Sequence, residues 1–238
     1  EVYNDLDGEI VKLFRVVRDR GDELRRALDL TPFSREEYLD AWEQCADPLE
    51  SARRAVIRSF MGFGSAAVTL TRKAGDAPSG RTAPTGFRNN SNRSGTTPAH
   101  DWRNYPEQVV AVIERLRGVV IENRHYAKLM PQMDQPDALF YCDPPYPSST
   151  RDAGGDYRHE MTDDDHREFA ATVRELSGMV IVSGYACELY DHELFADWQR
   201  VERPALADGA RPRTEVLWLN AACSEALERE KTQQRLIA

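Results

Sequence analysis

The sequence D-P-P-Y at residues 143–146 contains the residue types of a rigid acceptor site. Pro144 and Pro145 fix the φ angle at two consecutive residues and remove two N–H donors, but their carbonyls remain acceptors. The Asp143 carboxylate and the Pro144 carbonyl thus offer two acceptors beside the flat ring of Tyr146. This set suits an exocyclic amine on a planar base, because accepting both amine hydrogens frees the nitrogen lone pair for attack. A base in a duplex must leave the helix to reach such a site.

The elements around this motif alternate between strands and helices. The apolar run 138–142 leads directly into Asp143, which places the acid where ligands bind in open α/β sheets, beyond the carboxyl end of a strand. The alternation predicts a parallel or mixed α/β sheet. Further strands are predicted at 1–6, 119–123, 178–185 and 214–220, and helices at 7–28 with an interruption near Gly21, 31–44, 47–63, 106–118, 162–176 and 187–198.

Three of the predicted helices have recognisable N-terminal residues. Ser34 is the expected N-cap of the second helix, with Glu37 three residues later in the pattern of a capping box. Pro48 marks the start of the third helix, and Thr162 is the expected N-cap of the helix at 162–176.

Charge is unevenly distributed along the chain. The formal net charge is −9, yet residues 71–104 contain six Lys or Arg residues and two acids. The same segment is rich in Gly, Pro, Ser, Thr and Asn and poor in aliphatic residues, so we expect a loop there. Such a basic segment on an acidic body suits a local contact with phosphates, and the alternative is a disordered linker.

The cysteines and the hydropathy indicate where the protein works. The four cysteines are isolated, without a C-x-x-C pair, which argues against a disulfide framework or a zinc site and fits a reducing cytoplasm. No apolar run approaches 18 residues and no signal peptide is visible, so we expect no membrane partner. The isolated cysteines lead us to expect no metal.

The D-P-P-Y motif resembles the catalytic motif of S-adenosylmethionine-dependent amino-methyltransferases that act on DNA. Four other segments are similar to Dam-like DNA adenine N6-methyltransferases of the D12-class type, particularly the solitary enzymes of phages and prophages. These segments are YNDLDGEIV at 3–11, TPFSREEY at 31–38, SGY…LY at 183–190 and EVLWLN at 215–220.

The resemblance implies an α/β fold with a Rossmann-like methyltransferase sheet and an inserted, mostly helical and loop target-recognition lobe. The catalytic domain would comprise residues 1–30 and 105–238, and the lobe residues 31–104. The implied reaction transfers a methyl group from S-adenosyl-L-methionine to a flipped adenine in double-stranded DNA.

The resemblance also implies roles for individual residues. Asp143 and the Pro144 carbonyl would bind the target amine, Pro145 would hold the turn, and Tyr146 would stack on the adenine. Asp5 would bind the cofactor ribose, and Asn123 or His125 would lie near the cofactor adenine, with Asp143 also facing the cofactor. Candidate DNA contacts are Arg88, Asn89, Asn90 and Arg93 in the lobe, and Ser148, Thr150 and Arg151 after the motif.

The family has two glycine motifs ahead of the region where this sequence starts, and they hold the methionine half of the cofactor. If the molecule begins at Glu1, we expect cofactor binding to be poor. Alternatives are therefore a DNA-binding remnant with impaired catalysis, or methylation of cytosine N4, RNA or protein. Asp143 favours adenine, because related enzymes on cytosine more often have Ser at this position and enzymes on protein glutamine have Asn.

Overall fold

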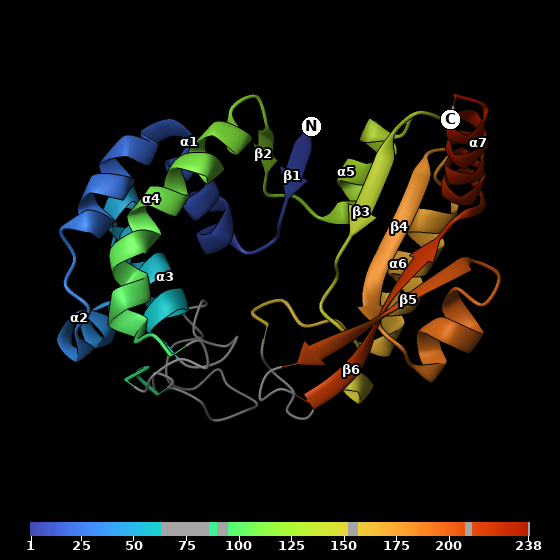
Figure 1. Ribbon diagram of the computed structural model, residues 1–238. Helices are drawn as coiled ribbons and strands as arrows, with labels where there is room; N and C mark the ends of the chain where they lie inside the picture. Colours follow the sequence, from blue (N-terminus) through green and yellow to red (C-terminus); the bar gives the residue numbers. More distant parts are fainter. Residues whose placement is uncertain (63–85, 90–94, 152–156, 208–210, 238) are drawn as a thin grey trace. The chain divides into compact units, whose positions relative to one another are not determined.

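The computed structural model forms two compact units, each with its own apolar core (Figure 1). The first comprises Glu1–Arg124 and Gly155–Arg158, and the second comprises His125–Gly154 and His159–Ala238. The structure describes residues 1–62, 86–89, 95–151, 157–207 and 211–237.

The first unit is a helical cluster beside a two-stranded parallel sheet. Its core contains apolar side chains from all of its helices, including Leu24, Tyr38, Ile57 and Ile113. In the sheet, Tyr3 pairs with Ile121. The elements are β1 (Val2–Asn4), α1 (Gly8–Asp29), α2 (Arg35–Asp40), α3 (Pro48–Met61), α4 (Pro98–Leu116) and β2 (Val120–Glu122).

The predicted interruption of the first helix near Gly21 is confirmed. Arg20 leaves the helical conformation, with φ −135° and ψ 31°. A Cβ atom on Gly21 would lie 2.4 Å from Cγ1 of Ile113, a buried residue of α4. The glycine therefore allows the backbone of α1 to approach α4 closely at the irregular turn.

The predicted starts of the next two helices are confirmed as well. The Ser34 hydroxyl accepts a hydrogen bond from the Glu37 N–H at 3.1 Å. Pro48 lies in the first turn of α3, and the N-cap of that helix is Asp47, whose carboxylate accepts from the Glu50 N–H at 2.7 Å. These caps satisfy backbone donors that a helix start leaves without partners.

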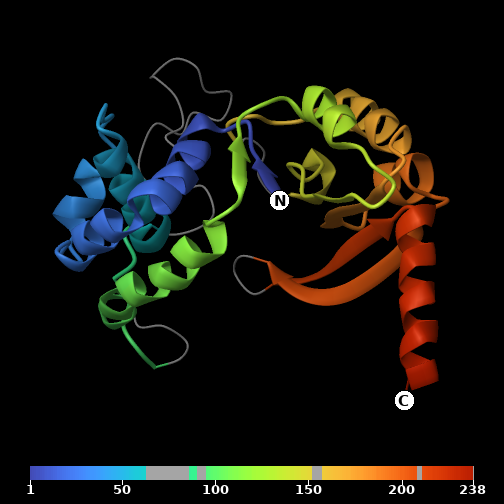
Figure 2. The same ribbon diagram turned by 90° about the horizontal axis from the view of Figure 1, so that it is seen from above.

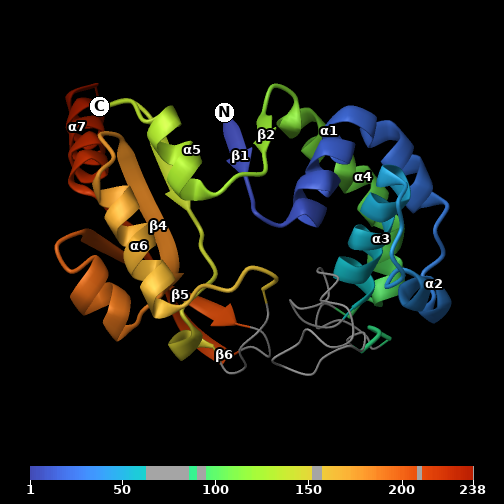
Figure 3. The same cartoon turned by 180° about the vertical axis from the view of Figure 1, so that it is seen from behind.

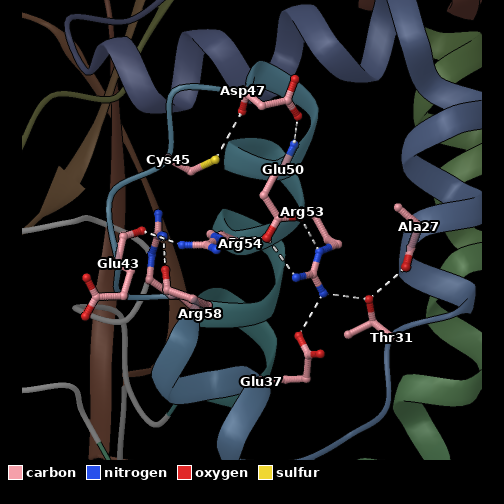
Figure 4. A network of polar contacts seen from close by, with 11 residues as sticks. Ala27, Thr31, Glu37, Glu43, Cys45, Asp47, Glu50, Arg53, Arg54 and Arg58 are labelled. Atoms are coloured by element: carbon pink, nitrogen blue, oxygen red, sulfur yellow. Dashed lines mark hydrogen bonds and ion pairs between the residues drawn. The ribbon is translucent and has the colours of Figure 1, made fainter.

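A network of ion pairs joins these helices (Figure 4). The Arg53 guanidinium donates to Glu50 on its own helix and, at 2.8 Å, to Glu37 of α2. It also donates at 2.9 Å to the Thr31 hydroxyl, which in turn donates to the Ala27 carbonyl of α1. One side chain thus connects α3 to α2 and to the end of α1.

The fourth helix differs from the prediction, because α4 begins at Pro98 and not at Pro106. Thr97 caps its N-terminus, with its hydroxyl accepting from the His100 N–H at 3.2 Å. Buried residues recur at helical spacing from Trp102 through Pro106 to Val109. This apolar stripe extends the helix over residues that composition assigned to the basic loop, and it outweighs the cost of an interior proline.

The second unit contains a mixed four-stranded sheet with the order β3-β4-β6-β5. Strand β3 runs parallel to β4, whereas β6 is antiparallel to both β4 and β5. Figure 2 shows β5 and β6 as a curved two-stranded ribbon. The predicted α/β class and mixed sheet are confirmed. The strands are β3 (Leu139–Cys142), β4 (Met179–Tyr185), β5 (Gln199–Ala207) and β6 (Arg211–Leu219).

Helices cover this sheet and complete its core. Figure 3 shows α6 (Asp163–Arg174) lying along β4, and its Phe169 and Val173 pack with the buried valines of that strand. Thr162 and Asp165 form the capping box at its N-terminus. The helix predicted at 187–198 is the short π-helix η3 (Leu189–Leu194). Four further elements were not predicted: α5 (Tyr126–Met133), the 3-10 turn η2 (Ser148–Thr150), β5 and α7 (Ala221–Ile237).

Candidate active site

Asp143 lies at the carboxyl edge of the sheet in the second unit. It directly follows β3, whose last residue, Cys142, pairs in parallel with Val182 of β4. Parallel strands end at the same edge, so the last residues of β4 lie beside Asp143. The antiparallel strand β6 reaches the same edge with its N-terminal half, where Glu215 pairs with Tyr185.

The electrostatic surroundings of Asp143 disfavour its charge. Although the side chain reaches the surface, nearby protein atoms displace enough water to raise the pKa of its carboxyl. Repulsion from Glu215 raises this pKa further, whereas hydrogen bonding with Tyr146 lowers it. A poorly hydrated carboxylate is a strong hydrogen-bond acceptor for a donor that reaches it.

Tyr146 is half-buried beside this acid. Its ring centroid lies 4.8 Å from that of Tyr185, with the planes at 76°. Burial raises the pKa of its hydroxyl to about 12, the carboxylates of Asp143 and Glu215 raise it as well, and a hydrogen bond with Ser183 opposes them. The hydroxyl therefore stays protonated at neutral pH, and the ring is held against a second aromatic side chain.

Three residues of this edge received no role from the sequence. Ser183, Tyr185 and Glu215 belong to segments that resemble the methyltransferases, but the resemblance alone did not connect them with Asp143. Their proximity depends on strand pairing across about 40 to 70 residues of chain. Their place at strand ends, next to a predicted site, is the signal that could have identified them.

The first unit places two of the predicted cofactor residues together. Asp5 and Asn123 follow the parallel strands β1 and β2. The Asn123 side-chain amide donates to the Asp5 carbonyl at 2.7 Å and to the Leu6 carbonyl at 3.1 Å. The Asp5 carboxylate accepts from the Asp7 N–H at 2.7 Å and from the Tyr3 hydroxyl at 3.1 Å. This end of the sheet is thus fixed from both strands.

His125, the third cofactor candidate, belongs to the second unit. It is exposed and caps α5, where its Nδ1 accepts from the Ala127 N–H at 3.4 Å. Its ring centroid lies 4.4 Å from that of Tyr126. These contacts give His125 a local structural role.

The candidate DNA contacts of the lobe are described in part. Arg88 donates to the Phe60 carbonyl at 3.1 Å, and its guanidinium lies 5.5 Å from the centre of the Phe60 ring. Asn89 is exposed. Asn90 and Arg93 lie outside the described residues.

The three candidates after the motif have different surroundings. Ser148 is exposed in η2. Thr150 is buried, and its hydroxyl donates to the Pro147 carbonyl at 2.8 Å, which favours a role in shaping the turn. Arg151 is largely buried and donates to both carboxylate oxygens of Glu160, at 3.1 and 2.6 Å.

Other features of the described residues limit the chemistry that they can perform. All four cysteines are free thiols. Burial raises the pKa of Cys142, next to Asp143, to about 12, so its thiol stays protonated. Among the described residues, no group of three or more His, Cys, Asp or Glu side chains is placed to hold a metal ion. No helix in the described ranges is long and apolar enough to cross a membrane.

Comparison with known proteins identifies a family. The model of a family described as D12 class N6 adenine-specific DNA methyltransferase matches residues 1–203. No curated protein matches the sequence.

Proposed function

We propose, from the premise that this chain belongs to the D12 class N6 adenine-specific DNA methyltransferases, that the edge of the sheet at Asp143 receives the target adenine. The protein is a DNA adenine N6-methyltransferase that uses S-adenosyl-L-methionine. One observation supports this placement of the adenine site. Asp143 directly follows β3 in surroundings that raise its pKa, and the half-buried ring of Tyr146 lies beside it.

The proposed site acts on the amine of a flipped base. The Asp143 carboxylate and the Pro144 carbonyl accept its two N–H bonds, which directs the nitrogen lone pair away from the adenine ring. Pro145 fixes the backbone between these acceptors and Tyr146, whose ring stacks on the base. S-adenosyl-L-methionine supplies an electrophilic methyl group when bound. After transfer the amine nitrogen carries a positive charge, and the Asp143 carboxylate stabilises that charge until a proton leaves.

The carboxyl ends of β1 and β2 are the proposed cofactor site. A carboxylate accepts hydrogen bonds from vicinal hydroxyl groups, so Asp5 suits the two hydroxyls of a ribose. Support comes from Asn123, which donates to the backbone of Asp5 and keeps it in place. The residues present therefore fit the ribose of the cofactor. For His125 and Asp143, which belong to the second unit, a cofactor contact stays a prediction.

The proposed DNA contacts lie in residues 31–104, as the target-recognition lobe, and in the segment after the motif. Residues 1–30 and 105–238 form the proposed catalytic domain. The Arg88 guanidinium is fixed by its bond to the Phe60 carbonyl, so it can position a phosphate without losing much side-chain entropy. Arg151, which pairs with Glu160, stays a predicted contact. Asn89, Asn90, Arg93, Ser148 and Thr150 complete the proposed set. We place the reaction in the cytoplasm, because all four thiols are free.

Replacement of the acceptor tests the proposal. Asp143→Ala removes the carboxylate, so methyl transfer should fall by at least ~100-fold in single-turnover assays, whereas DNA affinity should change little. The matched control is Asp137→Ala, an exposed acid that precedes β3. Wild-type turnover in Asp143→Ala would remove Asp143 from the reaction.

A further inference from the structure

We propose that Ser183 and Tyr185 are positioning residues that hold the ring of Tyr146 in the orientation needed to stack on the flipped adenine. This inference rests on the proposed function, because it assigns a task to two neighbours of the proposed stacking ring. Both residues lie at the end of β4, next to the end of β3, and reach Tyr146 from one short segment.

Strand pairing explains why these residues meet Tyr146. Cys142 and Val182 are paired at the ends of two parallel strands. Beyond this pair β3 ends and the chain turns into the D-P-P-Y segment, whereas β4 continues through Ser183 to Tyr185 because β6 pairs with it. The last residues of β4 thus lie beside the D-P-P-Y turn, and the Tyr146 side chain packs against them.

Ser183 contacts the polar end of Tyr146. Ser183 is buried, with 7% of the residue exposed, and hydrogen bonding with its side chain lowers the pKa of Tyr146. A buried hydroxyl requires a partner, because leaving it without one costs the lost hydration. We therefore expect Ser183 to restrain the hydroxyl end of the Tyr146 ring.

Tyr185 contacts the ring itself. The T-shaped arrangement at 4.8 Å and 76° is one of the two preferred geometries for aromatic pairs. Such a contact resists rotation of Tyr146 about its side-chain bonds but leaves part of the half-buried ring accessible. Tyr146 is thus held at its ring by Tyr185, and its hydroxyl interacts with both Ser183 and Asp143.

Gly184, between the two, explains how the strand can lie in this place. A Cβ atom there would lie 3.2 Å from the indole carbon Cζ3 of Trp218 and 3.6 Å from the ring of Tyr190, and both of these side chains are fully buried. The glycine lets β4 pack against this aromatic core, and the core in turn fixes the strand. In the sequence S-G-Y at 183–185, the serine and the tyrosine therefore face Tyr146, and the glycine faces the aromatic core.

Stacking on a base requires the ring to be in place before the base arrives. If Tyr146 could rotate freely, part of the binding energy of the adenine would be spent on ordering it. Phosphate contacts supply most of the DNA affinity, so the DNA still binds when Ser183 or Tyr185 is replaced, but a smaller fraction of complexes has the amine aligned with Asp143. The expected defect is therefore in the rate of methyl transfer and not in DNA affinity.

The test compares single-turnover methylation, DNA affinity and thermal stability among variants of the whole protein. Tyr185→Ala should lower the methylation rate about tenfold, and Ser183→Ala about fivefold, with DNA affinity unchanged within about twofold. Tyr185→Phe keeps the ring and should restore most of the rate relative to Tyr185→Ala. Ser224→Ala, whose hydroxyl bonds to the Asn220 carbonyl after the opposite end of β6, is the matched control.

Rates for both Ser183→Ala and Tyr185→Ala within about twofold of wild type would overturn the inference. So would an equal loss in Tyr185→Phe and Tyr185→Ala, because the ring would then be irrelevant. If Tyr185→Ala unfolds, Tyr185→Leu keeps the apolar volume without a ring and is judged by the same outcomes. An active Asp143→Ala variant would instead defeat the proposed function, so the two failures are distinguishable.

Discussion

At the residue scale, the proposed role of Asp143 requires it to accept hydrogen bonds from an amine while remaining unprotonated. Its surroundings oppose the second requirement, since loss of hydration and the charge of Glu215 both raise its pKa. The same surroundings make the ionised form a better acceptor, because less water competes for its lone pairs. The pKa of Asp143 therefore connects the pH dependence of the reaction with its hydrogen-bonding strength.

The acid limb of the pH–rate profile tests this connection. Because the pKa of Asp143 is raised, the rate should begin to fall at a higher pH than for an ordinary carboxyl. Glu215→Gln removes a like charge, so the limb should move to lower pH in single-turnover assays. Glu225→Gln, on α7, should leave the limb in place. An unshifted limb in Glu215→Gln would show that Glu215 does not act on the titrating group.

Part of the proposed site could be inferred from the sequence because that part is local. Asp143, Pro144 and Tyr146 lie within four consecutive residues, so their chemistry can be read without knowing the fold. Ser183 and Glu215 could not be assigned, because only the pairing of β4 with β3 and β6 brings them to the same edge. Residue types carry no information about such register until the strands are paired.

At the element scale, helix starts were predictable and several other boundaries were not. Ser34 and Thr162 mark their helices through short-range hydrogen bonds, which depend on residues three positions away. The edge strand β5 contains Pro204 and forms through pairing with β6, so its own sequence is a weak signal. The early start of α4 at Pro98 was hidden by the loop-like composition around it.

The close approach of α1 to α4 gives a prediction at this scale. Gly21→Ala places a methyl group 2.4 Å from Cγ1 of Ile113, which is shorter than any van der Waals contact. Overpacking should outweigh the better helix propensity of Ala and lower the free energy of unfolding by about 1–2 kcal/mol. Denaturant unfolding measures this change.

A second substitution distinguishes packing from other causes. Ile113→Val alone should cost about 1 kcal/mol because it removes a buried methyl group. In the double variant Gly21→Ala/Ile113→Val, the two losses should be less than additive, since the smaller side chain gives room to the new one. Strict additivity would contradict the contact.

The ion-pair network of α2 and α3 predicts a loss of stability in acid. Hydrogen bonds from Arg53, reinforced by Arg54, hold the pKa of Glu50 at about 2 despite its partial burial. A depressed folded-state pKa means that the stabilisation is complete above pH 4.5 and is lost as the pH falls toward 2.

Urea unfolding between about pH 5 and pH 3 measures this loss of stability. The wild type should lose stability over this interval, whereas Glu50→Gln should start lower by about 2 kcal/mol and change less with pH. Glu114→Gln on α4, whose partner Arg117 is exposed, is the control and should follow the wild type. Parallel pH curves for the wild type and Glu50→Gln would contradict the network.

At the scale of the whole molecule, the net charge affects how the protein binds DNA. A chain with a formal net charge of −9 is repelled by a polyanion at long range, so contact must depend on local basic side chains. Arg88 is a proposed contact of this kind in the described part of the chain. A guanidinium has five N–H donors, so Arg88 can contact Phe60 and a phosphate together.

Salt dependence measures this local contribution. Replacing Arg88 with Ala should reduce the slope of log affinity against log salt by about 1, because one phosphate contact and its released counterion are lost. Arg117→Ala removes an exposed cation that pairs with Glu114 and should not alter the slope. An unchanged slope in Arg88→Ala would remove this residue from the DNA interface.

The most direct test of the central claim follows the methyl group itself. Duplex DNA, RNA and a protein mixture are each incubated with the enzyme and tritiated S-adenosyl-L-methionine, and the labelled products are identified after digestion. The label should appear as N6-methyladenine in DNA, and Asp143→Ala should abolish it while DNA binding persists. Label in cytosine, RNA or protein, or full labelling of adenine by Asp143→Ala, would contradict the account.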